Sequence, residues 1–326
     1  MPNLTEILGE INSAGSGHDV VRRKYLAKLS LLTGRDTIIY YSGWLQKNIP
    51  GLVPHLIVND NDKNGFMAAI HQLGRKSGLD LVLHTPGGDI AATESLVHYL
   101  RQMFGTDIRA IIPQIAMSAG TMVALASKEI LMGKHSNLGP IDPQIGGVFP
   151  AHGVIEEFTR AGAEISEAET SKEQQAKIAL WQPIIAKYSP TLIGQCLKAI
   201  KMSTDITTEW LESGMFVGES DAKTKAQRIT AALGSHDDNK THARHIHRER
   251  LVELGLKIIE IEQDQDIQDT ILSLHHACIH TLTHTPAIKL IENQMGVGLI
   301  LSAQFQFQSS PASGSPIPIG GETMAL

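Results

Sequence analysis

The sequence predicts an α/β protein with a parallel sheet covered by helices, and two patterns in the middle of the chain support this prediction. Short apolar runs, too sharply bounded for helices, end in turns rich in glycine or serine. The segments between these runs place apolar residues at helical spacing. Such an alternation of strands and helices is typical of a parallel, helix-covered sheet.

The first part of the chain leads into this sheet. Residues 3–33 keep a helical period that Gly15-Ser16-Gly17 interrupts, so two helices are expected there. The β-branched and aromatic residues of 36–41 predict the first strand. An irregular loop is expected over 51–62 and a helix over 66–73.

The central region repeats a strand, a turn and a helix. The three strands expected there are 79–83, 108–115 and 129–132. Helices are expected over 90–104 and from the serine-containing turn through Leu125. The glycine and paired prolines of 137–144 predict a loop.

The rest of the chain is expected to be mostly helical, apart from a strand at 257–261. The expected helices are 154–163, 164–177, 178–202 with a break at Pro190, 221–233, 244–254 and 264–283. The Gln-, Ser-, Pro- and Gly-rich end has few apolar anchors and is expected to be flexible. The predicted division is into N-terminal helices (1–34), a sheet core (35–203), a mostly helical extension (204–301) and a tail (302–326).

Composition restricts the class of protein. The 326 residues include 28 Lys and Arg against 34 Asp and Glu, so no basic field attracts nucleic acid. Cys196 and Cys278 are too few for the disulfide framework of a secreted protein. Residues 1–13 lack the pattern of a signal peptide, and no run reaches the ~18 apolar residues that span a bilayer. A cytoplasmic protein without membrane insertion is expected.

Two of the expected turns carry groups suited to chemistry. Gly87 and Gly88 follow Pro86 and leave bare N–H groups that can point at an anion. Ser118 begins a helix, beside the free N–H donors of its first turn. In a parallel sheet with right-handed crossovers both turns lie at one edge, so they should face each other. The alternative is that Ser118 only caps its helix.

The motifs TPGGD, AMSAGT and LGPIDPQ, in this order along the chain, resemble the serine dehydrogenase proteinase family. This family belongs to the Clp/crotonase superfamily and is related to signal peptide peptidase A. The resemblance covers roughly residues 36–300 and implies a Clp/crotonase-like parallel sheet core, with flanking helices and a mostly helical C-terminal extension. It also implies a serine endopeptidase that acts on polypeptides and assembles as a homo-oligomer. By the same resemblance, Ser118 is the nucleophile, and Gly87 or Gly88 forms the oxyanion hole with the Ala119 amide.

The sequence leaves the general base open. Relatives use Ser-Lys or Ser-His-Asp, and Ile141, Asp142 and Pro143 stand at the place of the Clp histidine, which argues against a Clp-type triad. Signal peptide peptidases take a lysine from the segment that follows. Lys187 is the first choice, because its neighbours are apolar and a buried lysine can deprotonate a serine. His135, after the third central strand, is the rival base.

Two other functions stay open. A member of the same fold can stabilise the enolate of an acyl thioester with the same turns, and a catalytically silent oligomeric scaffold needs Ser118 only as a cap. The histidines of 236–247 and the stripe His276, His280 and His284 match no catalytic zinc motif, so polar contacts such as those at a subunit interface are expected instead of a metal site. No GxGxxG occurs, and no cofactor is expected.

Overall fold

A computed structural model describes residues 3–14, 18–47, 49, 51–147 and 149–303. The strands of its main sheet are β1 (Asp36–Ser42), β2 (Leu79–His84), β3 (Ile108–Ile112), β5 (Glu129–Met132), β10 (Ile258–Glu260), β11 (Ala287–Asn293) and β12 (Gly298–Ser302). Their order is β10-β5-β3-β2-β1-β11-β12. The first five of these run parallel, whereas β11 and β12 are antiparallel to their neighbours. This mostly parallel sheet confirms the predicted fold class.

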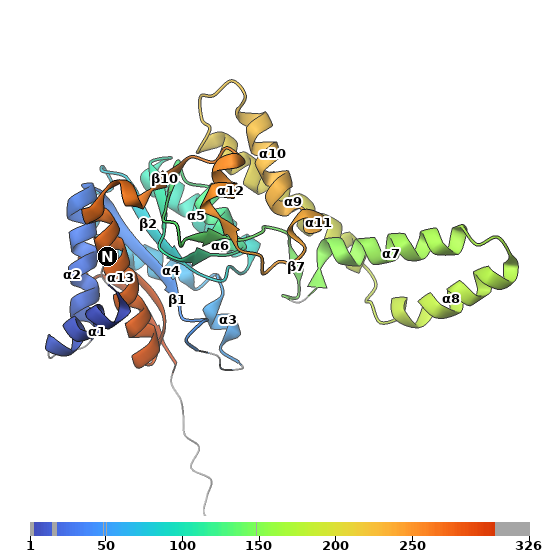
Figure 1. Ribbon diagram of the computed structural model, residues 1–326, viewed down its shortest axis with the longest axis horizontal. Helices are drawn as coiled ribbons and strands as arrows, with labels where there is room; N and C mark the ends of the chain where they lie inside the picture. The colour runs from blue at the N-terminus through green and yellow to red at the C-terminus, as the bar shows by residue number, and fades with distance from the viewer. Residues whose placement is uncertain (1–2, 15–17, 48, 50, 148, 304–326) are drawn as a thin grey trace, which may run out of the picture.

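Helices cover both faces of the sheet (Figure 1). They are α1 (Leu4–Ser13), α2 (Asp19–Thr33), α4 (Asp62–Ile70), α5 (Ile90–Phe104), α6 (Ala119–Leu125), α9 (Leu192–Ser213), α10 (Ala222–Gly234), α12 (Arg248–Glu253) and α13 (Gln265–His284). On one face, Leu26 of α2 and Leu274 of α13 share a buried cluster with Val82 of β2. On the other face, α4, α5 and α6 bury Leu83. Val82 and Leu83 reach opposite faces because side chains alternate along a strand.

An arm projects from the body of the molecule (Figure 1). It consists of α7 (Ala151–Ser166) and α8 (Ser171–Ile185), and α7 packs against both α8 and the start of α9. The short strands β7 (Gln144–Ile145) and β8 (Phe149–Pro150) pair at its root. The sequence predicts a solvated helix over 164–177, but the chain instead reverses direction between α7 and α8.

A smaller sheet lies beside the main one. Its strands are β4 (Ile115–Ala116), β6 (Asn137–Leu138) and β9 (Ile246–His247), in that order. The strand expected at 108–115 is interrupted at Pro113, so its end joins this second sheet. The helix expected at 244–254 is shortened to α12 because residues 246 and 247 pair with β6.

The other differences from the sequence prediction concern short or distant elements. The loop expected at 51–62 contains α3 (Val53–Leu56), which has Pro54 in its first turn, and α4 begins at Asp62. Helix α11 (His236–Asn239) and the 3-10 helix η1 (Ile261–Gln263) complete the described elements. The tail from 304 onward and Gly15-Ser16-Gly17 lie outside the described residues. No helix within the described ranges is long and apolar enough to cross a membrane.

The sequence also does not reveal how the C-terminal part joins the core. Strands β10, β11 and β12 come from the segment predicted as a mostly helical extension, and all three complete the main sheet. Helix α9 runs across the division expected between residues 203 and 204. The C-terminal part is helical as predicted, but its strands make it part of the same sheet.

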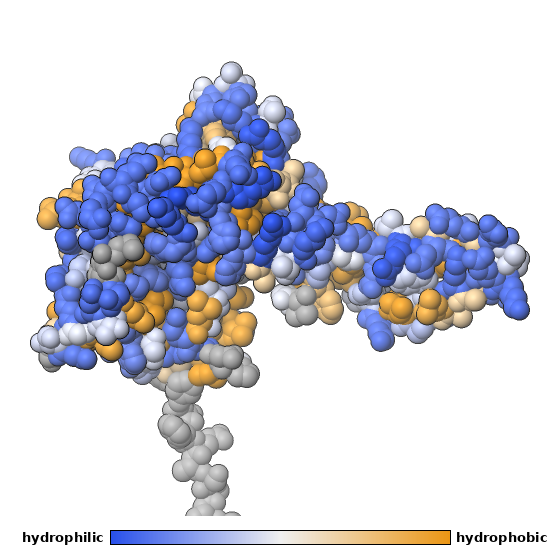
Figure 2. All heavy atoms as spheres, viewed as in Figure 1, coloured by the Kyte–Doolittle hydropathy of each residue, from blue (hydrophilic) through white to orange (hydrophobic). Residues whose placement is uncertain are grey.

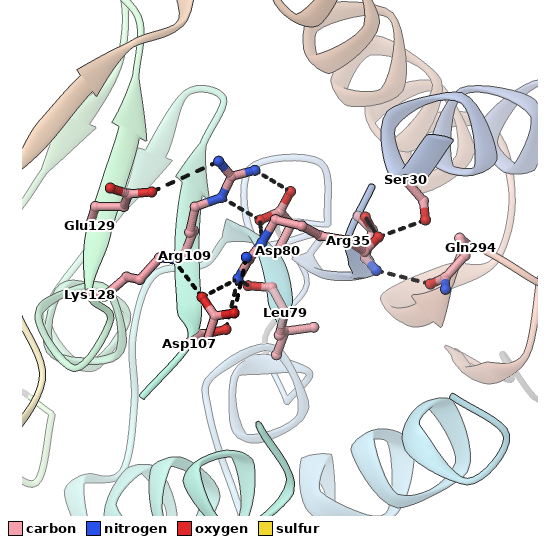
Figure 3. Close-up of polar contacts among 10 residues, drawn as sticks. Ser30, Arg35, Leu79, Asp80, Asp107, Arg109, Lys128, Glu129 and Gln294 are labelled. Carbon is pink, nitrogen blue, oxygen red and sulfur yellow. Dashed lines mark hydrogen bonds and ion pairs between the residues drawn. The ribbon is translucent and has the colours of Figure 1, made fainter. Parts of the chain in front are cut away.

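A charged network joins the amino ends of the strands (Figure 3). Asp80 of β2 is fully buried and accepts hydrogen bonds from Arg35 Nε at 2.8 Å and from Arg109 Nε at 2.7 Å. Asp107 pairs with Arg35 at 3.0 Å and with Lys128 at 2.6 Å. The network therefore fixes the edge of the sheet opposite the one where the glycine-rich and serine-containing turns lie.

Candidate active site

Two turns meet at the carboxyl edge of the sheet. The glycine turn (residues 85–89) follows β2, and the serine turn (residues 116–120) follows β4. Thr85 joins them, because its carbonyl accepts the Met117 amide at 3.0 Å and its own amide donates to the Ile115 carbonyl at 3.3 Å. The two turns thus lie side by side, as the parallel arrangement of the strands requires.

Gly87 makes the closest contact between the turns. Its φ is 92°, in the left-handed region that favours glycine. A Cβ at this position would lie 2.6 Å from the Met117 carbonyl oxygen and 2.7 Å from Ser118 Cβ. No side chain fits there, so the approach of the two turns depends on glycine.

Ser118 has a strained backbone, with φ 51° and ψ −119°. Such a conformation costs a non-glycine residue about 1–3 kcal/mol and occurs most often at functional sites. Ser118 occupies the N-cap position of α6, yet its side chain makes no capping hydrogen bond. The hydroxyl is partly exposed and has no hydrogen-bond partner in the described part of the chain. These features do not fit a serine whose role is to cap a helix.

Two backbone amides beside Ser118 have no acceptor. Ala119 is the first residue of α6, where an amide lacks an intrahelical partner. Within the described residues, neither the Ala119 amide nor the Gly88 amide donates a hydrogen bond. The Gly87 amide, by contrast, donates to Thr85 Oγ1 at 3.1 Å. The geometry therefore favours Gly88 and Ala119 over Gly87 as donors to an oxyanion.

The two bases expected from the sequence do not contact Ser118 in the described structure. Lys187 follows α8 on the arm, and its side chain is exposed. The burial expected from its apolar neighbours is wrong for this chain, because Tyr188 packs within the arm against Phe158 while Ala186 and Lys187 are exposed. His135 is exposed as well, in the turn after β5. Within one chain, neither side chain is in hydrogen-bonding contact with Ser118 in the described structure.

The structure contains a histidine–carboxylate pair near the site that the sequence analysis does not identify. Asp142 is buried, and one of its oxygens lies 2.8 Å from His242 Nδ1. The other oxygen lies 3.6 Å from His236 Nδ1. Burial raises the pKa of Asp142, but the hydrogen bond and charge of His242, together with His236, lower it below the usual value overall. An ionised carboxylate only accepts hydrogen bonds, so His242 Nδ1 is the donor in this contact.

The place of this pair in the smaller sheet limits its role. Strand β6 lies between β4, which leads to Ser118, and β9, which follows His242. The strand that follows His242 therefore pairs with β6 and not with β4. Asp142 stands at the place of the Clp histidine, which is a signal in the sequence, but its partner is 100 residues away. The contact connects the loop after β6 to the C-terminal part of the chain.

Two buried histidines lie beside the glycine turn. His84 ends β2, and its ring centroid is 4.4 Å from that of Trp44 and 5.4 Å from that of His275. Neither ring nitrogen of His84 has a hydrogen-bond partner in the described structure. Burial lowers the pKa of His84 to about 3. Burial, followed by the charges of His84, His276 and His135, lowers the pKa of His275 well below its usual value. Both imidazoles are thus neutral near pH 7, and His84 is a poor base.

The match to known proteins is consistent with this geometry. The family of ClpP-like SDH-type serine proteinases matches residues 46–281, which include both turns and the arm. An uncharacterized protein of Methanocaldococcus jannaschii is 29% identical over 208 residues, which are 64% of this chain and 61% of that protein. A second one from the same organism is 32% identical over 151 residues, 46% of this chain and 52% of that protein. The chain therefore spans less than two thirds of each relative. Because the family match covers most of the chain, the protein belongs to the ClpP-like SDH-type serine proteinases, as its motifs predict.

Proposed function

We propose that this protein is a serine endopeptidase that hydrolyses polypeptides with Ser118 as its nucleophile. The observation that carries the proposal is the state of Ser118 itself. Its backbone is strained, its hydroxyl caps nothing, and the unpaired amides of Gly88 and Ala119 lie in the two adjoining turns. Membership of a family of serine proteinases supports the same reaction.

In the proposed mechanism, Ser118 Oγ attacks the carbonyl carbon of the scissile peptide bond, and its proton passes to a general base. The carbonyl oxygen becomes an oxyanion, which the Gly88 and Ala119 amides stabilise by hydrogen bonds. The base then protonates the leaving amine as the tetrahedral intermediate collapses to an acyl-enzyme. A water molecule, deprotonated by the same base, hydrolyses the acyl-enzyme and restores Ser118.

Lys187 is the base in this proposal, and a second copy of the chain would supply it. The arm that carries Lys187 also has apolar atoms on its surface, shown in orange (Figure 2). On α8, Ile178 is 43% and Leu180 61% exposed. Exposed apolar surface of this kind marks interaction sites. In a homo-oligomer, the arm of one copy would cover the serine turn of the next and bury Lys187, as a general-base lysine requires.

The cysteines support a reducing compartment. Cys196 and Cys278 are both free and buried, and they lie in separate hydrophobic clusters. Reduced, buried thiols are typical of proteins in the cytoplasm, where disulfides are rare. A cytoplasmic location is therefore part of the proposal.

The proposal is tested by mass spectrometry after treatment with a reactive fluorophosphonate. We expect a single adduct on Ser118 in the wild-type protein and none in Ser118→Ala. Light scattering and circular dichroism establish that both proteins are folded and equally associated. A folded, associated wild type that takes no label would contradict the proposal and favour the scaffold. Turnover of an acyl thioester without labelling would favour the enolate chemistry.

The general base is tested with Lys187→Met, His135→Ala and His242→Asn. We expect Lys187→Met to lower kcat/KM by about 10²–10⁴-fold, the usual contribution of a general base, and His135→Ala to have little effect. The contribution of a second copy has its own test. Mixed oligomers of Ser118→Ala and Lys187→Met, each inactive alone, should regain part of the activity. A fully active Lys187→Met variant would contradict this assignment. A loss of activity in His135→Ala or in His242→Asn would then indicate which residue is the base.

A further inference from the structure

A buried ion pair lies close to the glycine turn. Lys289 of β11 is 2% exposed, and its Nζ lies 2.7 Å from Asp62 Oδ1. The second carboxylate oxygen of Asp62 accepts the Tyr40 hydroxyl at 2.7 Å. Lys289 and Asp62 are far apart in the sequence and belong to elements that meet at the β1–β11 side of the sheet. None of the steps proposed for Ser118 uses this pair.

The same two side chains hold the short segment 57–59. Lys289 Nζ donates to the Ile57 carbonyl at 2.8 Å, and the Asn59 amide donates to Asp62 Oδ2 at 3.1 Å. Val58, between these two residues, is therefore anchored on both sides. One of these hydrogen bonds is made by Lys289 and the other by Asp62, the two members of one ion pair.

Val58 in turn fixes the glycine turn. The Val58 amide donates to the Gly87 carbonyl at 2.8 Å, and the Asp89 amide donates to the Val58 carbonyl at 2.9 Å. The described chain has no cis peptide bond, so the Gly88 N–H points away from the Gly87 carbonyl within the same peptide plane. With the carbonyl directed at Val58, the Gly88 N–H must be directed away from Val58. Val58 therefore sets the direction of the proposed oxyanion donor.

Tyr40 also belongs to this network, through its hydrogen bond to Asp62. Burial and then Asp62 raise the pKa of Tyr40 well above its usual value, and the Thr85 side chain opposes them. Thr85 Oγ1 accepts the Gly87 amide at 3.1 Å. The Gly87 carbonyl is thus connected to the ion pair through Val58, and the Gly87 amide is held within the turn by Thr85.

We propose that Lys289 and Asp62 are positioning residues that hold the Gly88 amide in its oxyanion-binding direction by anchoring the segment 57–59. This inference rests on the proposed peptidase function, in which Gly88 is an oxyanion donor. A purely structural role explains the arrangement less well, because a buried ion pair is often no more stabilising than apolar residues of similar volume. The pair does supply donors and acceptors to the backbone on both sides of Val58.

The test compares Lys289→Met with the double variant Asp62→Asn/Lys289→Met. The single variant leaves a buried, unpaired carboxylate and is expected to be unstable. The double variant removes both charges, so its melting temperature should recover, but the Ile57 carbonyl still lacks its donor. We expect the double variant to keep its KM and to lose about 10–100-fold in kcat, less than the complete loss of an oxyanion donor.

Arg109→Met is the matched control. It removes one partner of the buried Asp80 in the charged network at the amino ends of the strands (Figure 3), which contains no residue of the segment 57–59. It should lower the melting temperature and leave kcat unchanged at temperatures where the protein is folded. The positioning role would be overturned if the double variant kept the wild-type kcat. It would also be overturned if kcat decreased in proportion to the melting temperature in all variants, Arg109→Met included.

Hydrogen exchange tests the positioning independently of any peptidase activity. In the double variant, the Val58 and Asp89 amides, which form the bonds between the two segments, should exchange faster than in wild type, and in Arg109→Met they should not. This result would support the anchoring even if the wild type hydrolysed no peptide, in which case only the peptidase proposal would fail. Unchanged exchange at Val58 and Asp89 would overturn the anchoring itself.

Discussion

Replacement of Ser118 by alanine is expected to abolish peptide hydrolysis while leaving the fold intact. Removal of the nucleophile of a serine hydrolase lowers kcat by on the order of 10⁴–10⁶-fold, because the oxyanion hole alone gives little turnover. The hydroxyl makes no hydrogen bond that the fold would lose. The measurement is steady-state hydrolysis of a casein or fluorogenic peptide substrate, normalised to folded protein.

A second substitution separates the strain at this position from its chemistry. Ser118 has φ 51°, a conformation that glycine adopts without penalty. Ser118→Gly should therefore be about 1 kcal/mol more stable than Ser118→Ala, although both are inactive. Equal stability of the two variants would show that the turn relaxes when the hydroxyl is absent. Residual hydrolysis within tenfold of wild type in either variant would exclude Ser118 as the nucleophile.

Acid is expected to destabilise the protein strongly through His84 and His275. Both are neutral in the folded protein, with the pKa of His84 lowered to about 3, whereas in the unfolded chain a histidine takes up a proton near pH 6.5. The unfolded state therefore binds more protons than the folded state between about pH 6.5 and pH 3. The free energy of unfolding decreases as the pH is lowered through this range. His84 contributes about 1.4 kcal/mol per pH unit in this window, so it alone removes roughly 3 kcal/mol at pH 4.5, and His275 adds to the loss in the same direction.

The measurement is the free energy of unfolding from urea titrations between pH 7.5 and pH 4.5. His84→Phe keeps an aromatic ring against Trp44 and should remove the contribution of His84, about 1.4 kcal/mol per pH unit below pH 6.5. It should be no less stable than wild type at pH 7.5, because both nitrogens of His84 lack partners. The exposed His71→Gln is the control and should keep the wild-type slope. An unchanged slope in His84→Phe would contradict the assignment.

The parts of the fold that the sequence predicts correctly are those set by local patterns. The strand Leu79–His84 and the helix Ile90–Phe104 are recognisable because a short apolar run, a glycine turn and a helical period follow one another. The same pattern puts the serine turn beside the glycine turn, since parallel strands end at one edge. No local pattern, however, shows that Ser118 leaves its helix uncapped.

The elements that the sequence does not predict depend on distant partners. Strand β11 is buried throughout, yet it contains Lys289, Glu292 and Asn293, which hide its apolar character. These side chains are tolerated because Asp62, Arg22 and the Ala69 carbonyl, each more than 200 residues earlier in the chain, satisfy them. A prediction based on neighbouring residues in the sequence cannot identify such partners.

The exposure of Lys187 is not predicted for a related reason. The apolar residues beside Lys187 predict burial, but Tyr188 packs into the arm and the ammonium group stays in solvent. Neighbouring residues in the sequence predict the burial of a side chain only when the element they form packs inside the body of the protein. In a projecting hairpin, the surroundings of Lys187 depend on what packs against the arm.

The position of β11 has a consequence for how the protein is made. This strand is hydrogen-bonded to β1 and brings Lys289 against Asp62, yet it leaves the ribosome long after both turns. A nascent chain that ends before residue 287 contains both turns but lacks the strand that continues the sheet beyond β1. Ser118 is therefore translated long before the scaffold around it can close, and the sheet that carries the two turns is completed only after β11 has been synthesised.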